Sequence, residues 1–388
     1  MVPADATPLS RSCEPFLKDD SMMESLTVSG DERVGVVRAA LFRGTPGEFF
    51  QTWLPRPEPE PGELLVDVVG CTLCGSDLHT YEGRRQVAVP TVLGHEIVGR
   101  IAAIGDHATP PLDLEGDRLA VGDRVVWAIV AACGGCAPCE RGLPQKCERG
   151  VKYGHERATD RRTLTGGLAD VCLLAPGTAV VKIPADMPLE VACPASCATA
   201  TITAVFEPAG DITGRTIAVF GLGLLGLTAC AMARSKGASD VIAIDPLPAR
   251  RRQGLAFGAT DALSPGQVAS HPAAGRIDLA IEVSGAPAAF VEAVGHLGLG
   301  GAVHLVGAVA PMGTVAVDPE HVVRRLLTIR GIHNYAPRHL LAAVRFLATH
   351  GRGFPFAGLV SGWYPLCQAA EAFAAAAQTQ AVRVGVRP

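Results

Sequence analysis

Four cysteines in a segment rich in glycine and proline have the spacing of ligands to one metal ion. Three recur at every third position and the fourth follows eight positions later: Cys133, Cys136, Cys139 and Cys147. Thiolates bind zinc well, and four of them complete a tetrahedral coordination sphere that leaves no position for a substrate. The alternative is a set of unrelated buried cysteines, but the spacing favours a structural zinc site.

A second group of residues has the composition of a zinc site with an open position. Cys74 lies in Cys-Gly-Ser-Asp-Leu-His and His95 lies in Gly-His-Glu, in neighbouring predicted loops. A catalytic zinc ion needs three protein ligands and an open fourth position. Cys197 is our candidate for the third ligand because a β-rich pattern there gives way to alternating strands and helices, and Cys193 is the alternative. Ordinary core side chains are the competing interpretation for all of these residues.

A glycine-rich turn between a predicted strand and a predicted helix has the dinucleotide-binding pattern Gly-x-Gly-x-x-Gly. It follows the strand predicted at 216–220 and opens the helix predicted at 224–236. The first glycine permits the turn, the second admits a pyrophosphate and the third lets the helix pack on the strand. The helix N-terminus then meets the phosphates. The residues of this turn that we expect to contact a coenzyme are Gly221, Gly223, Leu224, Leu225 and Gly226.

An acidic residue at the end of the next predicted strand indicates which coenzyme is bound. Asp245 follows the strand predicted at 240–244, and its carboxylate can accept both ribose hydroxyls of NAD while repelling the 2′-phosphate of NADP. Arg250, Arg251 and Arg252 follow closely, and arginines can bind that phosphate. Solvated charges on a helix face are the alternative interpretation for them. We therefore predict NAD rather than NADP.

Two adjacent arginines lie between the first two predicted ligands of the second zinc site. A loop that leaves one ligand and returns to the next borders the mouth of that site, so Arg84 or Arg85 is predicted to hold an anionic group of the substrate. The planar guanidinium group matches phosphate or phosphonate oxygens in bidentate geometry. His333 follows the last strand of the predicted nucleotide unit and is expected to approach from the other side. The alternative is a pair of surface arginines that bind Glu82 or solvent.

The composition describes a compact protein large enough for two domains. The chain has 388 residues, 48% of them hydrophobic and 19% charged, and its formal net charge is −4. Such a chain has no basic field for nucleic acid or for an anionic membrane surface. It has no apolar run of about eighteen residues and no secretory signal, so we expect a cytoplasmic protein outside the membrane. In that reducing compartment, the twelve cysteines indicate metal ligation or buried thiols rather than a disulfide framework.

The strand and helix patterns predict an α/β protein in four parts. Residues 1–34 have the pattern of a loose N-terminal extension, 35–200 of a β-rich domain, 201–335 of a nucleotide-binding domain with a parallel sheet, and 336–388 of a return to the β-rich domain. The clearest elements are strands at 63–69, 216–220, 240–244, 277–283, 302–306 and 381–386, and helices at 224–236, 249–257 and 340–349.

Together, the two cysteine patterns and the glycine-rich turn make the chain resemble the zinc-containing medium-chain alcohol dehydrogenases, from about Val36 to the C-terminus. The resemblance implies a GroES-like catalytic domain, a Rossmann coenzyme domain and an active site in the cleft between them. It implies that Cys74, His95 and Cys197 hold a catalytic zinc ion and that the four-cysteine segment holds a structural one. We therefore expect two zinc ions per chain, with NAD as the coenzyme.

The resemblance also implies roles for residues around the predicted catalytic zinc ion. The hydroxyl of Ser76 contacts the reacting oxygen and starts a proton relay through the nicotinamide ribose, which His79 ends. Asp77 supports the His95 ligand, and Glu96 lies beside the metal. The residues implied to contact the coenzyme are Arg250 at the adenosine ribose and Ser284, Val306 and Gly307 on the nicotinamide side.

Shorter segments, at 71–79, 83–85, 152–156, 197–201 and 333–335, are similar to dehydrogenases proposed to act in phosphonate metabolism and to enzymes of phosphorylated cyclitols. This resemblance implies hydride transfer between NAD(H) and a small alcohol or carbonyl substrate that bears a phosphonate or phosphate group. Reduction of a cyclitol, including an enone, is the alternative. A zinc-independent reductase would not need the predicted zinc ligands, and a non-enzymatic protein would need none of this chemistry. We expect a homodimer or homotetramer in which strands around 302–317 pair across a two-fold axis.

Overall fold

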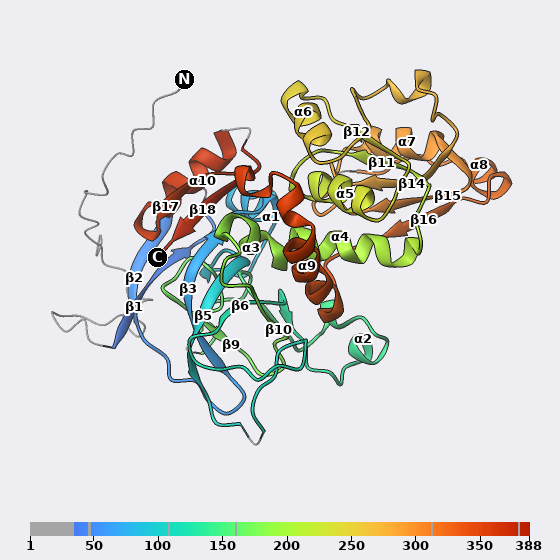
Figure 1. Ribbon diagram of the computed structural model, residues 1–388. Coiled ribbons are helices and arrows are strands. Elements are labelled where there is room, and N and C mark those ends of the chain that lie inside the picture. Colours follow the sequence, from blue (N-terminus) through green and yellow to red (C-terminus); the bar gives the residue numbers. More distant parts are fainter. Residues whose placement is uncertain (1–34, 46–47, 108, 160, 312, 379–380) are drawn as a thin grey trace.

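The computed structural model describes residues 35–45, 48–107, 109–159, 161–311, 313–378 and 381–388. The extension predicted at residues 1–34 lies outside these described residues. The chain forms a β-rich lobe and an α/β lobe, and helices α4 (Ala198–Phe206) and α9 (Pro337–Thr349) lie where the two lobes meet (Figure 1).

The β-rich lobe is built around a seven-stranded sheet with the order β10-β6-β5-β3-β18-β17, in which β9 also pairs with β3. The last strand, β18, pairs with β3, so segments more than 300 positions apart in the sequence share one sheet. Smaller sheets have the orders β2-β1-β4 and β7-β8. The strands are β1 Val36–Phe42, β2 Phe49–Pro55, β3 Leu64–Thr72, β4 Thr91–Val92, β5 Glu96–Ile104, β6 Arg124–Trp127, β7 Val130–Ala131, β8 Val151–Lys152, β9 Val171–Leu174, β10 Val180–Lys182, β17 Val360–Pro365 and β18 Arg383–Arg387.

Two glycines of that sheet leave room for a tryptophan ring. Gly70 lies on β3 and Gly385 lies on β18, and the ring of Trp363 packs over both. A Cβ atom at Gly385 would lie 2.3 Å from the ring, and one at Gly70 would lie 2.9 Å from it. Any larger residue at Gly385 would therefore displace the tryptophan, because a Cβ atom does not approach another carbon so closely.

The α/β lobe contains a six-stranded parallel sheet with the order β13-β12-β11-β14-β15-β16. Its inner strands are almost continuously apolar and buried, as is typical of a parallel sheet with helices on both faces. The strands are β11 Thr216–Phe220, β12 Asp240–Ile244, β13 Asp261–Leu263, β14 Ile277–Glu282, β15 Leu297–Leu305 and β16 Thr328–Gly331. The other α-helices among the described residues are α1 Gly75–Tyr81, α2 Ala137–Glu140, α3 Leu189–Ala192, α5 Leu224–Ser235, α6 Pro248–Ala256, α7 Pro287–Gly295, α8 Pro319–Arg324 and α10 Ala369–Gln378.

The predicted α/β fold, with a β-rich domain and a Rossmann-type parallel sheet, is confirmed. The strands predicted at 216–220 and 240–244 coincide with β11 and β12, and the helix predicted at 224–236 ends one residue early, before Gly237 at φ +84°. The strand predicted at 302–306 begins earlier, at Leu297, and its first part is irregular: Gly300 has φ +74° and the register against β14 shifts there.

In the region where strands were predicted around 302–317, the described residues form only β15, which ends at Leu305, and pairing across a two-fold axis stays a prediction. Strand β15 is hydrogen-bonded to β14 on one side and to β16 on the other, so its backbone groups are already used. Residues 306–311 and 313–317 form no strand. Among the described residues, β16 forms the edge of the sheet on this side, and all four of its residues are exposed.

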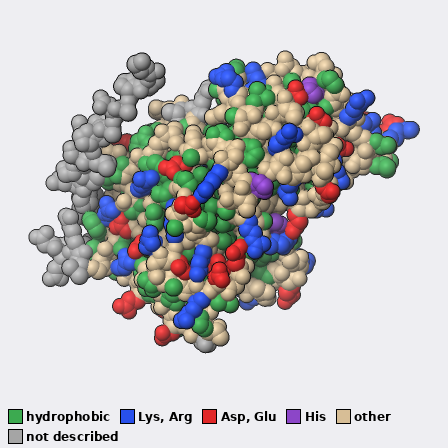
Figure 2. All heavy atoms as spheres, viewed as in Figure 1, with side chains coloured by type: hydrophobic (Ala, Val, Ile, Leu, Met, Phe, Trp, Pro, Cys, Tyr) green, Lys and Arg blue, Asp and Glu red, His purple; other side chains and the backbone are tan. Residues whose placement is uncertain are grey.

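The largest apolar core joins the two lobes. It contains Val98 and Val181 from the β-rich lobe, Ile217 and Leu227 from the α/β lobe, and Leu340 from α9. On the face drawn in Figure 2, positive and negative side chains are interspersed. No single helix in the described parts of the chain is long and apolar enough to cross a membrane. The bent pair formed by helical segments 189–196 and 198–209 meets that test by length and composition alone.

Candidate active site

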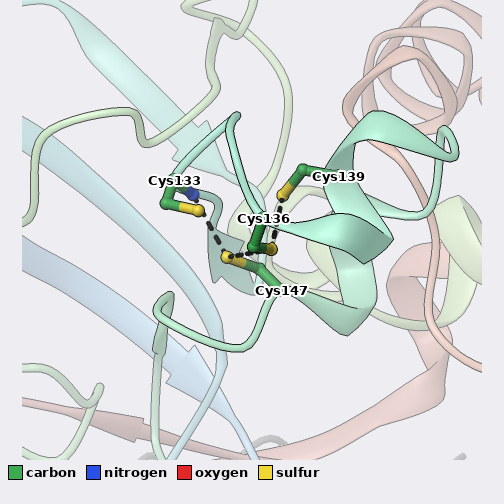
Figure 3. Close-up of side chains that lie close together, drawn as sticks. All are labelled: Cys133, Cys136, Cys139 and Cys147. Atoms are coloured by element: carbon green, nitrogen blue, oxygen red, sulfur yellow. Dashed lines mark hydrogen bonds between the residues drawn. The ribbon is translucent and has the colours of Figure 1, made fainter.

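The four cysteines of the first pattern come together in one loop of the β-rich lobe (Figure 3). The Sγ atom of Cys136 lies 3.4 Å from that of Cys139 and 3.7 Å from that of Cys147. All four sulfurs lie within 4.8 Å of one another. In a tetrahedral site with zinc–sulfur bonds of about 2.3 Å, neighbouring sulfurs lie about 3.8 Å apart. The four cysteines therefore fit one zinc ion without a further ligand.

The close approach of these four thiols also favours a bound cation. A hydrogen bond from the backbone of Gly135, followed by that from Cys147, lowers the pKa of Cys133 to about 6. Burial and the neighbouring Cys136 raise the pKa of Cys139 to about 11. Thiols this close cannot all ionise in the absence of a cation, because each thiolate disfavours the next. A divalent metal ion removes that conflict.

The second group joins three segments that are distant in sequence. Cys74 is the N-cap residue of α1, His95 directly precedes β5, and Cys197 directly precedes α4. The two sulfurs lie 3.8 Å apart, and the three ligand atoms lie within 4.8 Å of one another. This spacing also fits zinc, and the group supplies only three ligands. The alternative third ligand, Cys193, is buried outside the group and donates to the backbone carbonyl of Gly70 at 3.4 Å.

The imidazole of His95 is held by a buried carboxylate. Its Nδ1 lies 3.1 Å from Oδ1 of Asp77, and the other carboxylate oxygen accepts the backbone N–H of Cys74 at 2.9 Å. Because Asp77 fixes a proton on Nδ1, the lone pair of Nε2 is free to bind a metal. Nε2 lies 3.5 Å from the hydroxyl of Ser76. One aspartate therefore orients two of the three ligand residues.

Glu96 is fully buried behind this group and pairs with an arginine that the sequence did not single out. Both carboxylate oxygens accept hydrogen bonds from Arg383 at 2.8 Å, and Thr72 donates a third at 2.6 Å. The same guanidinium lies 3.6 Å from the sulfur of Cys74. The available signal was the arginine that begins the largely apolar strand Arg-Val-Gly-Val-Arg, since a buried charge there needs a partner.

A cavity of about 280 Å³ lies between the three-ligand group and the glycine-rich turn. The predicted residues that line it are Cys74, Ser76, His79, Arg85, His95, Cys197, Gly223, Leu224, Leu225, Ser284, Val306, Gly307 and His333. Other predicted residues lie outside its lining: Asp77, Arg84, Glu96, Gly221, Gly226, Asp245 and Arg250. Both lobes thus contribute to one concave space.

The glycine-rich turn has the geometry expected of a phosphate-binding turn. Gly221 has φ +95°, which favours glycine. A Cβ atom at Gly226 would lie 1.9 Å from the carbonyl oxygen of Gly221, whereas one at Gly223 would meet nothing within 4 Å. The third glycine is therefore required by packing, and the second leaves open space at the N-terminus of α5.

Asp245 and the arginines that follow it hold the end of β12 together. The carboxylate of Asp245 accepts the backbone N–H of Leu222 and of Leu247, each at 2.8 Å. Arg251 donates to the carbonyl of Asp245 at 2.7 Å, and Arg250 donates to the carbonyl of Ala381 at 3.3 Å. These two arginines are therefore bound to backbone oxygens.

The two adjacent arginines lie in different environments. Arg84 forms an ion pair with Glu82 and its side chain is 57% exposed. Arg85 faces the cavity instead. His333 also lines the cavity, and its Nδ1 lies 2.7 Å from Nζ of Lys146. Two further cavity residues, Lys152 and His155, were given no role by the sequence.

Comparisons with known proteins agree with this arrangement. Residues 60–185 match the alcohol dehydrogenase GroES-like domain, and residues 225–349 match the zinc-binding dehydrogenase domain. The chain is 29% identical to 5-exo-hydroxycamphor dehydrogenase of Pseudomonas putida, over 83% of this chain and 91% of that one. It is 30% identical to L-threonine 3-dehydrogenase of Deinococcus deserti, over 71% and 78% respectively.

Solved structures of dehydrogenases are also similar to this chain in fold. An alcohol dehydrogenase from Thermotoga maritima superposes with a TM-score of 0.83 at 26% identity and covers 91% of this chain and 99% of its own. A zinc-binding dehydrogenase from Sinorhizobium meliloti, solved with NADP bound, superposes with a TM-score of 0.78 at 25% identity, with the same coverage.

Proposed function

The chain belongs to the zinc-containing medium-chain alcohol dehydrogenase family, and on that premise we propose that it transfers hydride between NAD(H) and a small alcohol or carbonyl substrate bearing a phosphate or phosphonate group. The observation that carries this proposal is the shared cavity, in which the three-ligand group faces the glycine-rich turn. A coenzyme bound at the turn and a substrate bound at the ligands would meet there. A phosphorylated cyclitol belongs to the same substrate class.

The three ligand residues and their supports would hold a zinc ion that supplies Lewis-acid chemistry. Cys74, His95 and Cys197 supply the ligands, and Asp77 keeps the imidazole in the tautomer that presents Nε2. The buried pair of Glu96 and Arg383 places a positive guanidinium near the Cys74 sulfur. These contacts fix the position of the ligands before a substrate enters, which reduces the reorganisation needed during reaction.

Proton transfer is assigned to two cavity residues on α1. The hydroxyl of Ser76 lies beside the His95 ligand and can exchange a proton with a substrate oxygen. His79 also lines the cavity, and its buried Nδ1 has no hydrogen-bond partner among the described residues. Burial, followed by the charge of Arg84, lowers the pKa of His79, so its neutral ring can accept a proton. Ser76 and His79 would therefore move the proton between the cavity and solvent.

We propose NAD as the preferred coenzyme because of Asp245. The carboxylate lies at the end of β12 and is 8% exposed, and a buried negative charge disfavours a 2′-phosphate. Arg250 and Arg251, which could offset it, donate to backbone carbonyls. The measurement is kcat/KM with both coenzymes, and a clear preference for NADP(H) would contradict the assignment. The relative solved with NADP makes this comparison necessary.

The test of the function as a whole combines zinc analysis with a coenzyme assay. We expect two zinc ions per chain and a change in NADH absorbance when the enzyme meets small anionic alcohols, ketones or enones. Product analysis would distinguish reduction of a carbonyl from that of an enone. A protein that holds zinc, binds NADH and oxidises or reduces none of these classes would contradict the proposal.

We also propose that a second copy of the chain pairs along β16. An unpaired strand edge is self-complementary about a two-fold axis, and large apolar side chains surround this one. Leu299, Val323, Leu326 and Ile329 are 73%, 71%, 70% and 39% exposed. Replacing Ile329 with lysine should convert a dimer to a monomer in sedimentation experiments, and an unchanged mass would exclude this edge.

A further inference from the structure

One wall of the active-site cavity is positively charged without a matching negative charge. The cations Arg85 and Lys152 line the cavity beside the neutral imidazoles of His155 and His333, and the lining contains no aspartate or glutamate. Clustered like charges disfavour one another, and removal from water adds to that cost. Within the described residues, such an arrangement is most favourable when an anion occupies the space.

Lys152 is the most informative residue of this wall. It ends the short strand β8, and its ammonium group forms no hydrogen bond or ion pair in the part of the chain that the structure describes. Glu156 lies nearby, but its carboxylate accepts the backbone N–H of Lys152 at 2.8 Å and binds Arg162 at 3.3 Å. Burial, followed by the charges of Arg85 and Lys146, lowers the pKa of Lys152 to about 8. The lysine is thus a poorly compensated cation.

Lys146 is a second cation near this wall, and it contacts the cavity residue His333. Nζ of Lys146 donates to Nδ1 of His333 at 2.7 Å, so His333 is neutral and carries its proton on Nε2. Burial, followed by the charges of Lys146, Lys152 and Arg85, lowers the pKa of His333 to about 4. The histidine can therefore donate a hydrogen bond from Nε2 without adding charge.

From this arrangement we infer that Arg85, Lys152 and the Lys146–His333 pair form a subsite for a tetrahedral dianion, such as the phosphate or phosphonate group of the substrate. Three positive side chains attract a ligand group with two negative charges more strongly than a carboxylate group with one. The inference rests on the proposed function only in assigning that group to the substrate. Lys152 and Lys146, in addition to Arg85, then determine the specificity for an anionic substrate group.

Neither the zinc ligands nor the coenzyme would neutralise this wall. A zinc ion at the three-ligand group is balanced by the thiolates of Cys74 and Cys197. A coenzyme pyrophosphate is expected at Gly223 and the N-terminus of α5, and Arg383 is already paired with Glu96. The positive charges of the wall therefore remain after the cofactors have bound.

The experiment measures anion binding rather than turnover. The zinc-loaded enzyme is saturated with NADH, so that the pyrophosphate site is occupied, and is titrated by calorimetry with methylphosphonate, inorganic phosphate and acetate. We expect methylphosphonate and phosphate to bind more tightly than acetate. Lys152→Met and Arg85→Met should each weaken binding of methylphosphonate about ten- to a hundredfold, since each removes a charge-assisted contact.

Arg84→Met is the matched control, because this neighbouring arginine lies outside the cavity and pairs with Glu82. It should change methylphosphonate affinity less than twofold. Zinc content, NADH affinity and Tm are measured for every variant to verify that the fold is intact. Two correctly folded cavity variants that bind methylphosphonate as tightly as the unaltered enzyme would overturn the subsite, as would an unaltered enzyme that shows no saturable binding.

The same data separate this inference from the proposed function. Anion binding that depends on Lys152 and Arg85, in a protein without hydride transfer, would retain the subsite and reject the function. Turnover of a neutral alcohol with no binding of methylphosphonate would retain the function and reject the subsite.

Discussion

The two cysteine groups in this chain differ in how the fold assembles them. The four-cysteine group lies within one short segment, from Cys133 to Cys147, which includes α2. The three-ligand group joins Cys74 and Cys197, which are separated by 123 positions, and opens onto the cavity. A closed set of four ligands contributes folding energy, whereas an incomplete set leaves room for chemistry. The same metal-binding chemistry can therefore serve stability in one region and reaction in the other.

The largest expected effect comes from removing a ligand of the open group. Cys74→Ser should lower kcat by about a thousandfold or more, because the Lewis acid is lost or misplaced. Tm should change by only a few degrees, since this group stabilises no separate loop. The measurements are steady-state kinetics and calorimetric melting. A variant that retains near-normal turnover would remove the distinction between the two groups.

Removing a ligand of the closed group should have the opposite pattern. Cys136→Ser should reduce the free energy of unfolding by about 3 kcal/mol, because zinc binding to a closed site is coupled to folding. The fraction that remains folded should keep most of its kcat. Denaturant unfolding and active-site titration would show both quantities. Loss of turnover in a variant with normal stability would contradict the structural role of this group.

Asp77 offers a smaller change confined to the open group. Asp77→Asn should keep a hydrogen bond to His95 but remove the negative charge, which lowers zinc affinity about ten- to a hundredfold. Competition with a chelator should therefore release one zinc ion per chain more easily while the other stays. If both ions were released together, the two groups would not be independent.

Sites formed within one short segment could be predicted from the sequence, whereas contacts between distant segments could not. The four cysteines and the glycine-rich turn depend on short spacings, and both form as predicted from local patterns. Arg383 reaches Glu96 only because β18 pairs with β3, and no local pattern encodes that pairing. Adjacent side chains can point in different directions, so the sequence could not tell that Arg85, rather than Arg84, faces the cavity.

The lysine of the charged wall predicts that anion affinity at the open site depends on pH, which is not expected of the closed group. Lys152 faces Arg85, Lys146, His155 and His333, and a coulombic interaction with Cys197 favours its charge. Its pKa is lowered to about 8, and a bound anion favours the charged form. Anion affinity is therefore complete below about pH 8 and falls as the pH rises through that value.

Sulfate is the suitable probe for this dependence, because it keeps both negative charges throughout the range. Its affinity should fall about tenfold between pH 7.5 and pH 9.5. In Lys152→Met the affinity should be weak and nearly constant over the same range, since the titrating group is absent. If sulfate affinity in that variant fell with pH as steeply as in the unaltered enzyme, the pH dependence would belong to another titrating group.

The smallest expected effect tests whether the two regions are fully separate. Lys146 directly precedes the ligand Cys147 in the closed group, yet its ammonium contacts His333 at the cavity, 187 positions away. The segment that carries the four cysteines therefore also places the ammonium group of Lys146 beside a residue of the cavity. Lys146→Met should weaken methylphosphonate binding about three- to tenfold, because the lysine acts through His333. Zinc content and Tm should remain unchanged, since Lys146 is not a ligand. A shift in Tm without a change in anion affinity would confine Lys146 to the stability of its own loop, and the two regions would then be independent.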